Sequence, residues 1–212
     1  MFAAPFLILI DQRLVPGPLL FTSIALTVLL THREWRGVRL YDLKWSLSGR
    51  VVGVAVAALV LSVIPADRLA VLLGALVLLA VALSATGIKL GISPRTLLTA
   101  GALSGFMGTS VSVGGPPMAL LYQHETGGHI RGTLSAYFLV GVIISLIALS
   151  LIGRFGQTEL LLSLGLLPGV LFGFLVSRHG AAWLDRGSIR TGVLVVTAAS
   201  GLLVLFKGLG WV

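Results

Sequence analysis

The sequence predicts an all-α polytopic membrane protein, and its composition and residue patterning support that fold class. Hydrophobic residues make up 57% of the 212 residues, and only 10% are charged, whereas about a quarter of a soluble domain is charged. The apolar residues fall in runs of about 20, the length of a helix that crosses a bilayer. The basic residues behind the net charge of +8 stand in short clusters between these runs. That pattern is typical of membrane loops, so it excludes a soluble, disordered or nucleic-acid-binding protein.

The apolar runs place six full spans along the chain. We expect these spans at 14–31, 46–64, 68–87, 132–152, 158–177 and 188–208. Each run has few or no charges inside it, and the one acidic residue within these bounds, Glu159, stands at the start of 158–177. A carboxylate that relays protons at the middle of the membrane is therefore not expected.

A seventh apolar segment, 97–123, is long enough to span but is interrupted by Gly114-Gly115-Pro116-Pro117. A proline cannot donate to the helical hydrogen-bond ladder, and it pushes the preceding residue out of helical geometry. We therefore expect two half-helices that meet at a break. If this segment enters and leaves on the same side, most of the 15 lysines and arginines share one face of the membrane. The positive-inside rule thus favours a re-entrant hairpin in a multi-pass protein of the cytoplasmic (inner) membrane.

The two halves of the chain resemble each other, which predicts an internal repeat. Three pairs match at a constant offset, and they are Pro5 with Pro116, Gln12 with Gln123, and Thr22 with Thr133. We assign 1–91 to a first repeat and 92–212 to a second, within one membrane domain. Three crossings separate equivalent points, so the second copy is inverted, as in many secondary transporters. The first copy lacks a half-helix before its break and is expected to be shortened at its N-terminus. The alternative is that these matches reflect only the biased composition.

The segment around the second break carries the richest chemistry of the chain. Thr109, Ser110 and Ser112 offer hydroxyl groups, and Pro116 suits the first turn of a new half-helix. The N-terminus of that half-helix carries the positive end of a dipole, which favours an anion. The alternative is a packing kink without a ligand.

The resemblance to a known family rests on this segment. GFMGTSVSVGGPPMALLYQ (105–123), with AAPFL (3–7) as its counterpart near the start, resembles the TauE/SafE family of membrane permeases, often called sulfite exporters. The resemblance covers nearly the whole chain. It implies export of sulfite, an organosulfonate or a related small sulfur anion through two repeats, each opened by a Gly-rich broken segment. The chain departs from that pattern because its first Gly-rich half-helix is missing, which puts the completeness of the site in doubt.

The family motif carries over a set of substrate-binding candidates. These are Gly108, Thr109, Ser110, Ser112, Gly114, Gly115 and Pro116, with Pro5, Thr22, Gln12 and Gln123. The two glutamines could instead cap helix ends. Arg50 and Arg131 could attract an anion at the cytoplasmic mouth, although arginines near span ends more often snorkel to the headgroups.

The expected partners are the lipid bilayer and a small anionic substrate, with no nucleic acid, no metal and no cofactor. A homo-oligomer stays open. A membrane enzyme is not expected, because Ser104 has no candidate base nearby in the sequence. The alternative function is a membrane assembly factor, or an inactive shortened permease without transport of its own.

Overall fold

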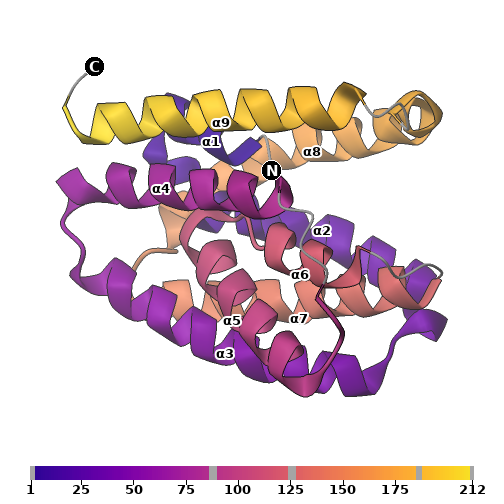
Figure 1. Ribbon diagram of the computed structural model, residues 1–212. Helices are drawn as coiled ribbons and strands as arrows, with labels where there is room; N and C mark the ends of the chain where they lie inside the picture. Colours follow the sequence, from indigo (N-terminus) through magenta and orange to yellow (C-terminus); the bar gives the residue numbers. More distant parts are fainter. Residues whose placement is uncertain (1–2, 86–89, 124–127, 185–187, 211–212) are drawn as a thin grey trace.

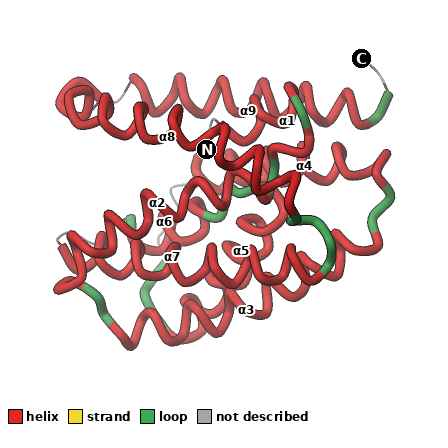
Figure 2. Tube along the Cα trace, turned by 180° about the vertical axis from the view of Figure 1, so that it is seen from behind, coloured by secondary structure: helices red, strands yellow, loops and turns green. Residues whose placement is uncertain are grey.

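The computed structural model describes residues 3–85, 90–123, 128–184 and 188–210, and every regular element in those ranges is helical. The helices in chain order are α1 (Ala3–Ile10), α2 (Gly17–Glu34), α3 (Leu40–Val63), α4 (Ala66–Ala85), α5 (Pro94–Val111), α6 (Gly115–Tyr122), α7 (Gly128–Leu151), α8 (Gln157–Leu184) and α9 (Ser188–Gly208). Two short 3-10 turns, η1 (Gln12–Leu14) and η2 (Trp35–Gly37), precede and follow α2. In the bundle α9 lies along one edge beside α4, and α3 lies along the opposite edge beside α5 and α7 (Figure 1; seen from behind in Figure 2).

Each of the six expected spans coincides with one of the helices α2, α3, α4, α7, α8 and α9. Within the described ranges, three helical stretches are long and apolar enough to cross a membrane, namely Leu40–Val63, Arg68–Ala85 and His129–Leu151. The described apolar parts of α8 and α9 are shorter.

The start of α3 corrects one expectation. The helix begins at Leu40 rather than at 46, so it contains Asp42, which is only 6% exposed. Asp42 stands in the first turn of α3, so the difference from the expectation lies in where this helix begins. The Asp42 carboxylate is tolerated there because it accepts a hydrogen bond of 3.1 Å from the Tyr122 hydroxyl.

The predicted break in 97–123 is confirmed, and it separates α5 from α6. Helix α5 begins with a capping box between Ser93 and Thr96 and ends at Val111, and the capping residue Ser112 that follows has a left-handed φ of 57°. Leu97, near the start of α5, shares a buried cluster with Leu121 and Tyr122 at the end of α6. Helix α6 therefore doubles back along α5, which agrees with the expected hairpin geometry.

Glycines bring the backbones of α3 and α5 into contact. A Cβ atom at Gly49 would collide with the Leu98 carbonyl, and one at Gly53 would collide with the Ala102 carbonyl. Gly101 and Gly105 on α5 meet the α3 backbone in the same way. Such small-residue packing is common between membrane helices, and here it places Arg50 of α3 directly against α5.

The element order agrees with the predicted repeat. A short helix is followed by three long ones in α1–α4 and again in α6–α9, and α1 and α6 both have eight residues. The inverted relation between the copies and the boundary between 91 and 92 stay predictions.

Candidate functional site at the helix break

Arg50 is a buried arginine inside the helical bundle. It is 1% exposed and lies about 15 Å along α3 from the start of that helix. Its guanidinium carbon is 4.9 Å from the centroid of the Tyr137 ring and 5.9 Å from that of Phe138, both on α7. A Cβ atom at Gly141 would collide with the guanidinium, so this glycine makes room for the charged group. Arg50 therefore lies deeper than the sequence predicts, and it does not snorkel.

The guanidinium has few hydrogen bonds for a buried cation. Nη1 donates to Ser104 Oγ at 3.4 Å, whereas Nε is buried without a hydrogen-bond partner. No carboxylate pairs with Arg50 in the described part of the chain. Asp42 lies two turns earlier on the same helix, about 12 Å along its axis, and bonds Tyr122. Since a buried charge is costly unless paired and hydrogen-bonded, this position favours an anion.

The second break of the chain adjoins this guanidinium. Ser104 Oγ donates to the Gly114 carbonyl at 2.5 Å while it accepts from Arg50. A Cβ atom at Gly108 would lie 3.3 Å from Arg50 Nη2 and 3.5 Å from Gly114 Cα. The two glycines therefore let the unwound backbone and the charged group approach each other, as glycines do where a backbone passes close to another group.

A hydrogen bond joins this break to the turn before α2. Ser112 Oγ donates to the Pro16 carbonyl at 2.9 Å, and Pro16 precedes the first residue of α2. The assignment of Pro5 to the first break stays a prediction. Pro5 lies within α1, but its side chain and that of Gln12 lie outside the described residues.

The remaining candidates occupy different surroundings. Thr109 is buried and shares a 2.9 Å hydrogen bond with Ser145 on α7, and Ser110 Oγ is buried without a hydrogen-bond partner. Thr22 is buried and donates to the Leu19 carbonyl of its own helix. Pro116 is buried, and Gly115 is partly exposed.

Two candidates lie away from Arg50, at the surface. Gln123 is exposed at the end of α6. Arg131 is exposed near the start of α7, where its Nε is 3.6 Å from a carboxylate oxygen of Glu34. The structure therefore brings together Arg50, Gly108 and Gly114, and leaves Gln123 and Arg131 at the rim.

Sequence reasoning missed the groups that hold Arg50. Ser104 is expected from the sequence to be a small packing residue and was weighed as a nucleophile, but not as a partner of Arg50, and Tyr137 and Gly141 are not singled out. One signal was present, because Gly141 interrupts a long run of large apolar residues.

Comparison with known proteins supports the family assignment. No curated protein and no solved structure matches this chain. A family model described as "Sulfite exporter TauE/SafE" matches residues 1–204, which is nearly the full length. The chain therefore belongs to the TauE/SafE sulfite exporter family of membrane permeases.

Proposed function

We propose that this protein exports a small sulfur oxyanion, such as sulfite or an organosulfonate, across the cytoplasmic membrane, and that Arg50 binds the anion at the helix break. The observation that carries the proposal is a guanidinium 1% exposed, with an unpartnered Nε and no carboxylate paired to it among the described residues. The family membership supports the substrate class.

The chemistry of Arg50 suits an oxyanion. A guanidinium stays charged in proteins and presents five N–H donors in a planar fork. Charge-assisted hydrogen bonds from such a fork to two oxygens are among the strongest in proteins. The Tyr137 ring and the hydrogen bond to Ser104 already restrain the group, so less ordering remains for the anion to impose.

The start of α6 contributes less than its position suggests. Pro116 and Pro117 stand in its first turn and carry no N–H group. Of the four residues 114–117 at the start of α6, only Gly114 and Gly115 therefore have a backbone N–H to donate. The guanidinium is therefore the main donor of the proposed site, and the helix dipole assists it.

The test is anion flux in proteoliposomes, with sulfite, sulfate and a small sulfonate compared under an imposed potential. Arg50→Gln should raise the half-saturating concentration roughly 10- to 100-fold, because it removes charge-assisted hydrogen bonds. Arg50→Lys should keep part of the flux. Arg33→Gln is the matched control, since it removes an exposed positive charge that is not among the site candidates.

Unchanged saturable flux by Arg50→Gln would place the anion elsewhere. Absence of flux from the unchanged protein would favour the alternative of an assembly factor or an inactive shortened permease.

A further inference from the structure

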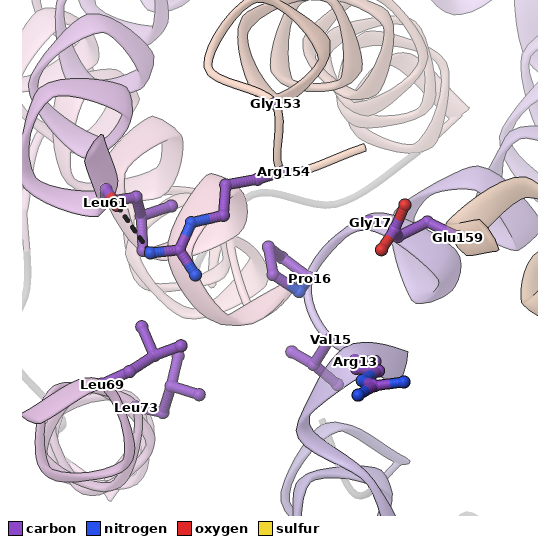
Figure 3. A pocket seen from close by; sticks show the side chains of 10 residues that line it. All are labelled: Arg13, Val15, Pro16, Gly17, Leu61, Leu69, Leu73, Gly153, Arg154 and Glu159. Carbon is purple, nitrogen blue, oxygen red and sulfur yellow. Dashed lines mark hydrogen bonds between the residues drawn. The ribbon is translucent and has the colours of Figure 1, made fainter. Parts of the chain in front are cut away.

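A hollow of about 250 Å³ lies at the other end of α3 from the Arg131 rim. It is bounded by the turn that precedes α2, the end of α3, the start of α4 and the loop between α7 and α8 (Figure 3). That volume equals several water molecules, at about 30 Å³ each in the liquid. Leu61, Leu69 and Leu73 form its apolar wall, and its charged lining groups are Arg13, Arg154 and Glu159.

Arg154 is held in place without a carboxylate. Its Nη2 donates to the Leu61 carbonyl at 3.0 Å, which satisfies an orphan acceptor in the last turn of α3. Glu159 lines the same hollow but is not paired with Arg154, and its Oε2 instead accepts from the Gly156 amide at 2.8 Å. Figure 3 shows the guanidinium on the Leu61 side, with Pro16 between it and Glu159. Most N–H donors of Arg154 therefore stay available to a ligand.

The hollow adjoins the helix break. Pro16 is one of its lining residues, and the Pro16 carbonyl accepts the hydrogen bond from Ser112. Leu61 follows Arg50 by 11 residues, about 16 Å along α3. The break thus stands between two guanidinium groups, one sealed inside the bundle and one in an open hollow.

We propose that this hollow is a second anion subsite, in which Arg154 binds a small sulfur oxyanion on the far side of the break from Arg50. The inference rests on the proposed function for the identity of the anion, but its charge selectivity can be measured without transport. The net positive lining favours an anion, because two arginines face one glutamate there.

The experiment uses the absence of native cysteines. The chain has no Cys, so Leu69→Cys places a single thiol in the wall of the hollow. The variant is labelled in proteoliposomes with two thiol reagents of similar size, one carrying a sulfonate and one a quaternary ammonium. The sulfonate reagent should react roughly tenfold faster, because a cationic cleft raises the local concentration of anions. Sulfate should slow that reaction.

Arg154→Gln in the same background should bring the two rates together and abolish the effect of sulfate, whereas Arg154→Lys should preserve both. Arg68→Gln is the matched control. Arg68 precedes Leu69 in the chain but lines a different hollow, with Ile64 and Val71, so its loss should change the ratio of the two rates much less.

The proposal would be overturned if the two reagents reacted at equal rates with Leu69→Cys alone. It would also be overturned if Arg154→Gln and Arg68→Gln changed the ratio of the two rates equally. Failure to label the thiol of Leu69→Cys would also overturn it. A charge-selective hollow in a protein without sulfite flux would support the subsite while contradicting the proposed function.

Discussion

At the residue scale, the main feature of the candidate site is the buried and incompletely hydrogen-bonded guanidinium of Arg50. The contacts with Tyr137 and Phe138 and the long hydrogen bond to Ser104 compensate only part of the lost hydration of the guanidinium. A structural role alone does not explain a cation in this position. In the proposed function, a bound anion would supply the missing interaction, so anion affinity and the cost of burying Arg50 would have one physical cause.

Stability should therefore rise when the charge is removed. Arg50→Met should leave the free energy of unfolding in detergent unchanged or increase it by roughly 1–4 kcal/mol, as for other buried charges replaced by apolar groups. Sulfite should raise the melting temperature of the unchanged protein but not that of the variant. Arg131→Met is the control at an exposed position. A large loss of stability in Arg50→Met would mean that the charge is fully compensated within the fold.

A second prediction concerns Ser112, which has a φ of 57° and bonds Pro16. Ser112→Ala and Ser112→Gly both remove the hydrogen bond, but only the alanine keeps a Cβ atom in the left-handed conformation. The glycine variant should therefore be more stable than the alanine variant by about 1 kcal/mol. Thermal unfolding of both variants in the same detergent measures this difference, and the reverse order would contradict the described geometry.

The sequence indicates part of the candidate site at this scale. Arg50 stands out as a charge in an apolar run, and the residues of the break follow from their glycines and prolines and from the family motif. Ser104 and Tyr137 were not selected, since they reach Arg50 from other helices. The rotation of each helix about its axis follows from packing, and an all-round apolar helix does not encode it in its periodicity.

At the element scale, the contact between α3 and α5 positions the site. The α5 backbone occupies the space where a side chain at Gly49 or Gly53 would lie. By contrast, a Cβ atom at Gly165, Gly169 or Gly173 on α8 would meet nothing within 4 Å among the described residues. Glycines on two helices of the same bundle therefore differ in their packing.

This contrast gives a matched pair of substitutions. Gly53→Ala should destabilise the fold by roughly 1–3 kcal/mol, because the new methyl group forces α3 away from the Ala102 carbonyl. Gly173→Ala should be neutral or slightly stabilising, since it adds helix propensity without a collision. Unfolding midpoints in denaturant measure both, and similar losses for the two variants would contradict the described packing.

The elements themselves were predicted well, with one informative difference. The break between α5 and α6 follows from two prolines after two glycines, a local signal. The early start of α3 was missed because Tyr41, Asp42 and Lys44 make that stretch polar. Burial of Asp42 depends on Tyr122, which lies 80 residues away in the chain. The hydropathy of the residues around Asp42 therefore cannot predict its burial.

At the scale of the whole molecule, the energetics of export follow from the charge of the cargo. In a cell that is negative inside, anion exit is favoured by about 2.3 kcal/mol per charge per 100 mV. We therefore expect an imposed potential to drive sulfite flux without a pH gradient. Asp42→Asn should preserve this flux, because the amide oxygen still accepts the Tyr122 hydrogen bond. Flux that requires a pH gradient, and is lost in Asp42→Asn, would indicate proton coupling through that carboxylate.

The global architecture was the least accessible to sequence reasoning. The order of elements follows from the spacing of apolar runs, and it agrees with the predicted repeat. The inverted relation between the copies depends on which way each helix crosses the membrane. The positive charges of the loops favour one orientation, but they set it for the chain as a whole and not helix by helix. The inverted relation between the copies therefore stays a prediction.

The sequence distance between Arg50 and Ser104 also affects biogenesis. Ser104 follows Arg50 by 54 residues, and at typical rates of synthesis it leaves the ribosome roughly 3 to 11 s later. During that interval α3 carries its charge into the membrane without α5 beside it, at an insertion cost of roughly 2.5–3.5 kcal/mol. We therefore expect the nascent α3 to stay at the translocon or the lipid headgroups until α5 is made. Slower membrane insertion would then be a consequence of the proposed role of Arg50 in binding the anion.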